Sequence, residues 1–163
     1  DAVGADGVGK MQGIVTGAGA GLDSTGAGDF THQNLYTLIE SVDSAYADMP
    51  GSGFLMSRNM VTECLKKADS NNRFNRLFYR GPNGYEFDGH RVISVPQMAS
   101  VAAGNVPCVY GDLSAYKVRV VGAPRIYRSL QPNKNEMIEF YGFWDADGEL
   151  INSNAVKKLT IAS

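Results

Sequence analysis

The residues that could do chemistry in this 163-residue chain begin with a glycine-rich stretch that carries a lysine. Gly4, Gly9 and Lys10 reproduce part of the pattern G-x-x-x-x-G-K, in which backbone N–H groups and a lysine hold nucleotide phosphates. However, Met11 stands where this pattern needs a hydroxyl group for magnesium, and Gly13 follows where a helix should begin. A nucleotide-binding enzyme that uses this stretch is therefore only a remote alternative.

Two neighbouring carboxylates form a second candidate site. Asp145, Asp147 and Gly148 superficially resemble a calcium-binding loop. The glycine falls at the wrong position of that loop, and Val156 occupies the twelfth position, where a carboxylate is required. We therefore expect Asp147 and Gly148 to form the turn of a β-hairpin.

Imidazoles and thiols complete the set of reactive side chains. Neither His32 nor His90 lies at metal-ligand spacing from Cys64 or Cys108, which argues against a zinc site. No G-x-S-x-G motif or comparable nucleophile elbow is present in the sequence. The sequence thus predicts no catalytic residue, no cofactor, no metal and no small-molecule substrate, and we do not expect an enzyme.

The composition favours one globular domain of ordinary type, with 44% hydrophobic and 20% charged residues. A net charge of -2 and scattered Lys and Arg residues disfavour direct nucleic-acid binding. No apolar run approaches the roughly 20 residues that span a bilayer, so we expect a soluble chain without membrane contact.

Cys64 and Cys108 lie in apolar patterns, which favours two reduced core thiols. The start at Asp1, without a Met, suggests a trimmed or processed piece.

The first element of regular structure is an amphipathic helix. Thr31 is a suitable N-cap, and Asn34 lies on the expected polar side. Pro50 disfavours a helical conformation at Met49, so the helix must end by Asp48. The apolar residues recur at helical spacing: Leu35, Leu38, Ile39, Val42 and Tyr46.

A short buried strand over residues 53–56 leads into a second helix. Ser57 should cap this helix, and Glu63 and Lys67 are placed for an i,i+4 ion pair on its solvated face. Its apolar stripe is expected to contain Met60, Val61, Cys64, Leu65 and Ala68.

The remaining segments alternate between turns and strands. Residues 81–90 concentrate turn formers and predict a protruding hairpin or loop, with His90 as a surface turn residue. Strands are expected at residues 91–95 and 106–110, and Pro107 favours an edge position or the start of a strand. The glycine-rich residues 1–29, including the GAGAG at residues 17–21, are interpreted as a flexible connector. This order of elements favours the α+β class.

The last third of the chain, residues 111–163, has the clearest strand pattern. Val118 and Val120 alternate with Lys117 and Arg119 at the period of a strand. In residues 137–144 both alternating faces are largely apolar or aromatic. This strand should therefore be covered on both sides or lie against another chain.

The chain resembles the major capsid protein family of tailed bacteriophages, which has the Hong Kong phage type fold. The resemblance is carried, in order, by DGVGK near the start, FLMSRNMVTECLKKADSNNRF, GYEFDGHRVISVPQM, NVPCVYGDLSAYKVRVVG and FYGFWDADGELINSNAVKKLTIA. It implies an axial domain with a mixed central sheet flanked by helices, and a long β-hairpin of a peripheral domain. The N-terminal arm, the extended loop and the spine helix of that family have no counterpart here.

The resemblance also implies how the chain is divided. Residues 1–29 would be a glycine-rich N-terminal segment, and residues 30–122 the axial domain. Residues 123–152 would be the peripheral-domain hairpin, and residues 153–163 a C-terminal strand that rejoins the axial domain.

The implied function is structural. The chain would be a truncated subunit of an icosahedral phage or prophage shell that assembles into pentamers and hexamers. It would enclose DNA without sequence-specific binding, in the virion capsid and, during assembly, in the host cytoplasm. An encapsulin-like nanocompartment shell protein is the alternative with the same fold, and a small ligand-binding domain is a third option.

Candidate inter-subunit contacts follow from the same resemblance. The hairpin residues are Arg125, Tyr127, Arg128, Glu139, Tyr141 and Trp144, and the turn-rich residues 81–90, expected near the capsomer axis, contribute Asn83, Tyr85 and His90. The alternative for Tyr141 and Trp144 is that they pack within their own chain.

Overall fold

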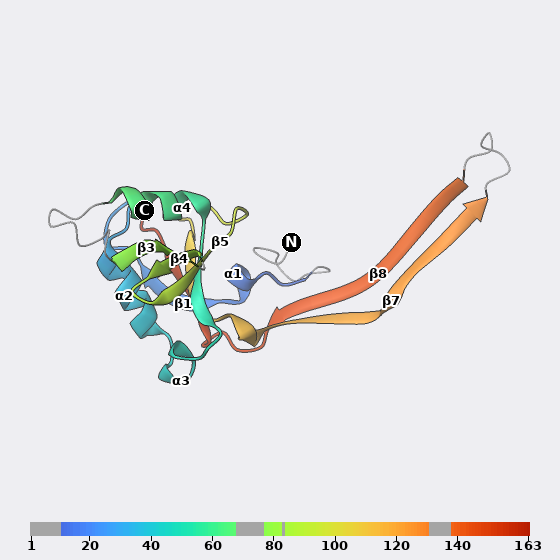
Figure 1. Ribbon diagram of the computed structural model, residues 1–163, viewed down its shortest axis with the longest axis horizontal. Helices are drawn as coiled ribbons and strands as arrows, with labels where there is room; N and C mark the ends of the chain where they lie inside the picture. The colour runs from blue at the N-terminus through green and yellow to red at the C-terminus, as the bar shows by residue number, and fades with distance from the viewer. Residues whose placement is uncertain (1–10, 68–76, 83, 131–137) are drawn as a thin grey trace.

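The chain folds into a sheet-based body from which a long hairpin projects (Figure 1). This arrangement is seen in a computed structural model, which describes residues 11–67, 77–82, 84–130 and 138–163. The body carries the helices and the hydrophobic core, while the hairpin extends away from it. Large hydrophobic side chains are therefore mostly buried in the body, whereas many of those on the hairpin are exposed.

Seven strands of the described residues form one mixed sheet in the order β1-β9-β6-β2-β5-β4-β3. The β1–β9 and β2–β5 pairs are parallel, and the other neighbours are antiparallel. The expected mixed sheet in an α+β fold is thus confirmed. The strands are β1 (Gly19–Asp23), β2 (Ser52–Met56), β3 (Phe78–Gly81), β4 (Gly84–Phe87), β5 (His90–Ser94), β6 (Cys108–Asp112) and β9 (Val156–Thr160).

Helices pack on this sheet, and the first predicted helix is divided in two. The described helices are α1 (Ile14–Gly17), α2 (His32–Ser41), α3 (Ser44–Ala47), α4 (Arg58–Lys66) and the short 3-10 helix η1 (Leu113–Ala115). The chain leaves α2 at Val42, and the Asp43 carboxylate starts α3 by accepting from the Ala45 N–H at 3.0 Å. A side-chain cap that competes with the continuing helix explains the break.

The expected polar side of α2 also needs a correction at Asn34, which is buried. Its side-chain oxygen accepts from the backbone N–H of Thr31 at 2.8 Å and from the Thr31 hydroxyl at 2.9 Å. Asn34 therefore belongs to the capping arrangement of the helix, where its polar atom is satisfied locally.

The core consists of two hydrophobic clusters. The larger one joins α2 and α4 to the sheet through residues such as Leu35, Met60, Phe54 and Tyr110. The smaller one includes Val109, whose side chain points to the opposite face from Tyr110 because neighbours in a strand alternate. The sheet is thus packed on both faces.

Both cysteines lie in the larger cluster as free thiols, which confirms the prediction of core positions. Burial raises the pKa of the Cys64 thiol to about 12, and burial raises the pKa of Cys108 as well. Because the thiolate is the reactive form, both side chains behave as packing residues at neutral pH.

The interpretation of residues 17–21 as a flexible connector is wrong, because β1 occupies most of this segment and pairs with β9. A Cβ atom at Gly19 would lie 2.5 Å from the carbonyl oxygen of Ser153, and one at Gly21 would lie 2.7 Å from that of Lys158. Glycine is needed at these two positions because backbone atoms of another segment lie too close for a side chain. The high glycine content of this segment therefore reflects close packing and not flexibility.

Within residues 81–90, Gly81 ends β3, Gly84–Phe87 forms β4 and His90 begins β5. Asp88 and Gly89 have φ values of 47° and 83°, which fit the tight turn between β4 and β5. His90 is not a surface turn residue: it is half-buried at the start of β5, with Nδ1 3.1 Å from the hydroxyl of Tyr110. Pro107 directly precedes β6, which is central in the sheet, so it marks a strand start.

Helix α4 confirms its predicted cap, since the Ser57 hydroxyl accepts from the Met60 N–H at 3.2 Å. Two details differ from the prediction. Leu65 is exposed, and Glu63 pairs with Lys66 at 3.1 Å instead of with Lys67. Ala68, expected in the apolar stripe, lies outside the described residues.

Lys67 makes a different set of contacts and fastens α4 to the preceding loop. Its ammonium group donates to the carboxylate of Asp29 and to the carbonyl oxygen of Phe30, the latter at 2.8 Å. The same group lies 4.5 Å from the centroid of the Phe30 ring. The hydrogen bond from Lys67 holds the pKa of Asp29 below its ordinary value of 3.8.

We expect Lys67→Met to lower the free energy of unfolding by about 1 kcal/mol, since a half-exposed ion pair and a cation–π contact are lost. Because the pKa of Asp29 is depressed in the folded state, the pair stabilises above the ordinary pKa and is lost as pH falls through the folded one. Urea unfolding should therefore show a wild-type advantage near neutral pH that shrinks below about pH 4. Lys66→Met serves as the control, and an advantage that persists in acid would contradict the assignment.

Candidate functional site

The candidate site is the projecting hairpin, formed by β7 (Tyr116–Leu130) and β8 (Ile138–Leu150), which pair antiparallel as a separate two-stranded sheet. The predicted turn at Asp147 and Gly148 is wrong, because these residues pair with Arg119 and Val118 inside the ladder. A Cβ atom at Gly148 would lie 2.6 Å from the Tyr116 hydroxyl oxygen, so this glycine allows a close contact. The strands are connected through residues 131–137, which lie outside the described residues.

The root of the hairpin is fastened to the body. The Tyr116 hydroxyl donates to the carbonyl oxygen of Gln12 at 2.7 Å, and the Gln12 N–H donates to that of Gly148 at 2.9 Å. In the connection from β6 to β7, the Asp112 carboxylate accepts from the N–H and the hydroxyl of Ser114, both at 2.9 Å. The direction of the hairpin is therefore set by the body. Strand pairing begins at Tyr116, and the expected domain boundary at residue 123 stays a prediction.

The hairpin bends part-way along its length (Figure 1). The register shifts between Val121 and Arg125, so that residues 122–124 lie opposite Trp144 alone. Gly122 has a φ of 72°, and Pro124 has no N–H for the ladder. Such a bulge bends its strand. The β7 strand has two more residues than β8 at this point, which is an even number. The alternation of side chains between the two faces of the hairpin is therefore the same before and after the bulge.

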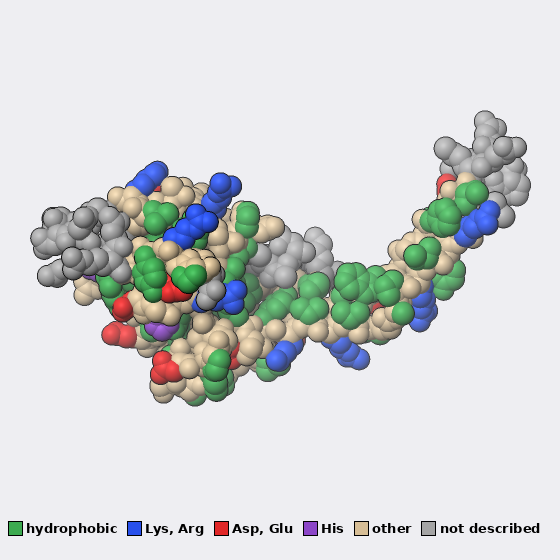
Figure 2. Space-filling view, viewed as in Figure 1, with side chains coloured by type: hydrophobic (Ala, Val, Ile, Leu, Met, Phe, Trp, Pro, Cys, Tyr) green, Lys and Arg blue, Asp and Glu red, His purple; other side chains and the backbone are tan. Residues whose placement is uncertain are grey.

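One face of the hairpin is apolar. Residues directly opposite in a ladder share a face, so the register defines this set. We call it the apolar face: Val118, Val120, Ile126, Ile138, Phe140 and Trp144, together with Arg128. Trp144 is 63% exposed and Phe140 is 67% exposed. Figure 2 shows hydrophobic side chains uncovered along the hairpin.

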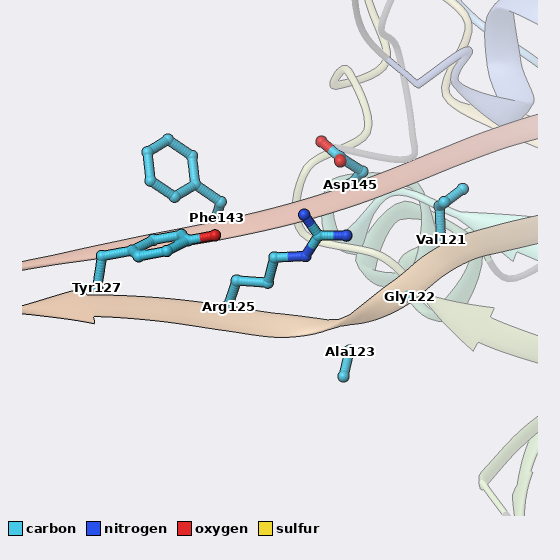
Figure 3. A pocket seen from close by; sticks show the side chains of 7 residues that line it. All are labelled: Val121, Gly122, Ala123, Arg125, Tyr127, Phe143 and Asp145. Carbon is cyan, nitrogen blue, oxygen red and sulfur yellow. The ribbon is translucent and has the colours of Figure 1, made fainter.

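The other face carries most of the charge, and we call it the charged face. From β7 it presents Lys117, Arg119, Val121, Arg125 and Tyr127, and from β8 it presents Glu139, Tyr141, Phe143, Asp145, Asp147 and Glu149. At the bulge it is hollowed into a depression of about 350 Å³. Figure 3 shows Arg125, Phe143 and Asp145 on the same side of the hairpin, with Ala123 on the other.

Two local contacts order the charged face. The rings of Tyr127 and Phe143 meet edge to face with centroids 5.9 Å apart. The hydroxyl of Tyr141 donates to the carboxylate of Glu139, and this hydrogen bond raises the pKa of Tyr141 above its ordinary value of 10.0. Tyr141 is therefore neutral at physiological pH and can donate a hydrogen bond.

The structure brings the six hairpin residues of the predicted contact set onto one element. Four lie on the charged face and two, Arg128 and Trp144, on the apolar face. The alternative in which Tyr141 and Trp144 pack within the chain is wrong, since both are exposed. Their role between subunits stays a prediction.

Of the other three residues of that set, Tyr85 and His90 lie in the seven-stranded sheet and not on the hairpin. Tyr85 is half-buried on β4 and stacks on Phe78 with ring centroids 5.9 Å apart. His90 is held against Tyr110, as described above. Asn83 lies outside the described residues, as does the phosphate-loop pattern at residues 4–10.

The described part of the chain offers no arrangement typical of metal chemistry. Among its His, Cys, Asp and Glu residues, no group of three or more is placed to hold a metal ion. Within the same residues, no helix is long and apolar enough to cross a bilayer. What the hairpin does offer is an extended surface on which large hydrophobic side chains are exposed.

Solved capsids have the same fold. The capsid of an empty GTA particle, computed with C5 symmetry, superposes with a TM-score of 0.82 at 22% identity, over 99% of this chain and 60% of that one. The capsid of the native GTA particle also gives 0.82, at 20% identity, over 99% and 59%. A structure of Gordonia phage Cozz gives 0.64 at 18% identity, over 99% and 55%. The chain thus spans about 60% of the length of the first two.

The sequence comparisons agree with the fold. No curated protein matches the chain. The sequence model of the phage capsid family matches residues 2–161, which is nearly the whole chain. Together with the mixed sheet and the projecting hairpin, this match shows that the chain belongs to the phage capsid family.

Proposed function

We propose that this chain is a structural subunit of a phage-type capsid shell and that it acts by self-assembly. The observation that carries the proposal is the hairpin, whose large apolar residues are exposed along both strands. A two-stranded ribbon is only marginally stable alone in water, and extended exposed apolar surface is typical of protein interfaces. The hairpin is therefore built to be covered in an assembly.

The six hairpin residues of the predicted set are proposed to contact neighbouring subunits. Trp144 and Tyr141 offer large aromatic surfaces, and Arg125 and Arg128 offer guanidinium groups, which are the residue types that dominate interface energetics. Tyr85, His90 and Asn83 are proposed to lie near the capsomer axis. The matched GTA capsids were computed with C5 symmetry, which supports an oligomeric capsid assembly here.

We further propose that the shell encloses DNA without reading its sequence. The net charge of -2 supports this, because a basic footprint is missing from the composition. The proposed location is the virion capsid, and the host cytoplasm during assembly. The matched family and capsids are of phage and GTA type, which favours this function over the encapsulin-like alternative.

Size-exclusion chromatography with light scattering tests the proposal. At high micromolar concentration, we expect the chain to form closed oligomers of five or six subunits, visible as rings or shells by electron microscopy. A chain that remains strictly monomeric under these conditions would contradict self-assembly through the hairpin.

A further inference from the structure

Helix α3 and the loop after it contact the hairpin both where the chain enters it and where the chain leaves it. The chain enters through η1 (Leu113–Ala115) and leaves directly after β8. The side-chain amide of Asn152, just after β8, donates to the Tyr46 hydroxyl of α3 at 3.0 Å. The Leu113 N–H donates to the carbonyl oxygen of Gly51, in the loop after α3, at 3.2 Å. In Figure 1, α3 lies close to the place where the hairpin leaves the body.

Helix α3 is itself fastened to central strands of the sheet. The Tyr110 hydroxyl of β6 donates to the carbonyl oxygen of Ala47 at 3.0 Å. The Ser52 hydroxyl of β2 donates to the carbonyl oxygen of Tyr46 at 2.6 Å. Carbonyl groups of a last helical turn have no partner within their helix, and four residues are too few for a helix that is stable alone. These two hydrogen bonds therefore fix the place of α3 on the sheet.

The root of the hairpin is held from both faces of the sheet. Tyr46 and Ala47 pack against the larger hydrophobic cluster, which contains Tyr110. The other fastening, from Tyr116 to Gln12, lies with the smaller cluster, against which Tyr116 packs. Because the two clusters lie on opposite faces of the sheet, loss of either fastening would allow the hairpin to tilt.

We propose that α3 is a bracket that fixes the direction of the hairpin, with Tyr46 and Asn152 as its positioning residues. The bracket is a property of the single chain. Its consequence for assembly rests on the proposed function, because the hairpin meets neighbouring subunits only when it points in the right direction. If only a fraction of the chains hold the hairpin in place, the apparent affinity between subunits is reduced by that fraction.

The variant Tyr46→Phe tests the bracket. It removes the hydroxyl group that accepts from Asn152 and keeps the aromatic ring that packs against the core. We expect the ratio of held to released hairpins to fall roughly fivefold, which corresponds to the loss of one neutral hydrogen bond.

Pulsed electron paramagnetic resonance measures the distance between the body and the hairpin. Leu65→Cys on α4 and Ile126→Cys on β7 carry the spin labels, because both positions are exposed, while the buried Cys64 and Cys108 stay unlabelled. Dilution with unlabelled chain restricts the measurement to distances within one chain. Tyr46→Phe is expected to add a second, broader population of distances. An unchanged distribution in a folded Tyr46→Phe chain would overturn the proposal, even if the variant were less stable in urea.

The matched control is Tyr36→Phe, which makes the same chemical change on α2. The Tyr36 hydroxyl donates to the carboxylate of Asp88 at 3.0 Å, in the turn between β4 and β5. The distances of this variant should equal those of the wild type. Equal broadening in Tyr36→Phe and Tyr46→Phe would show a general loosening of the body and would overturn the bracket.

Asn152 gives a second route to the same contact. Asn152→Asp keeps the oxygen that accepts from the Asn154 N–H at 2.9 Å, and its carboxylate can accept from the Tyr46 hydroxyl, so we expect wild-type distances. Asn152→Ala should broaden the distribution, but less in the Tyr46→Phe background than in the wild type, because the two residues share one interaction. Equal broadening in both backgrounds would contradict the pairing.

Self-association of unlabelled chains separates the bracket from the proposed function. Tyr46→Phe is expected to associate more weakly than the wild type, by at most the same roughly fivefold factor. Wild-type association in a variant with broadened distances would overturn the role of the bracket in assembly. A wild type that remains monomeric would contradict the proposed function, whereas the distances within single chains decide the bracket in either case.

Discussion

Replacing Trp144 or Phe140 with serine is expected to weaken self-association strongly and to leave the fold of the body intact. Both side chains are more than half exposed in the isolated chain, so their removal costs little in folding. In an assembled state they would be covered, and truncation of a central aromatic contact typically costs about 2–4 kcal/mol of association free energy. That loss corresponds to an association constant that is roughly 30- to 1,000-fold lower.

Leu65→Ser is the matched control, because Leu65 is also a large exposed hydrophobic residue but lies on α4 of the body. Light scattering measures association, and urea unfolding measures the stability of each variant. If Trp144→Ser and Leu65→Ser weaken association equally, the hairpin has no special role. A large loss of stability in Trp144→Ser would instead show that the side chain supports the folded chain.

Gly111→Ala is expected to destabilise the body by about 3 kcal/mol or more, which is a large part of the stability of a domain of this size. Gly111 lies in the central strand β6 with a φ of 148°, a conformation that favours glycine. A Cβ atom there would lie 2.0 Å from the carbonyl oxygen of Ala155. That oxygen accepts from the Asp112 N–H at 2.9 Å, so the added methyl group must push the two chain segments apart.

Gly142→Ala provides the comparison, since Gly142 is in strand β8 and a Cβ atom there would meet nothing within 4 Å. We expect a change in stability within about 0.5 kcal/mol. Urea unfolding followed by circular dichroism gives both values. Equal stabilities of the two variants would show that β6 and the loop before β9 can separate without cost.

Local sequence patterns were sufficient to predict the helices α2 and α4, which pack on the sheet. The apolar spacing of Leu35 and Leu38 indicates α2, and the Ser57 hydroxyl marks the start of α4. These predictions succeed because a helix and its cap are formed by residues a few positions apart. The buried positions of Cys64 and Cys108 follow from the same apolar patterns.

Predictions from composition failed where glycine served close packing. Gly19 and Gly21 suggest a flexible connector, and Gly148 suggests a turn, yet all three lie in strands. In each case the atom that excludes a side chain comes from a segment distant in sequence, such as Ser153 or Tyr116. Sequence patterns do not show such neighbours, because only the fold brings them together.

Taken by itself, the sequence determined the α+β class, the resemblance to phage capsids and the expectation that the strand around Trp144 needs a partner. These properties depend on residue order and on alternation along one strand. Only the tertiary structure decided that β7 and β8 leave the body as a bent hairpin, with one apolar face and one charged face. The register between two strands assigns residues to faces and edges, and register is a property of the pair.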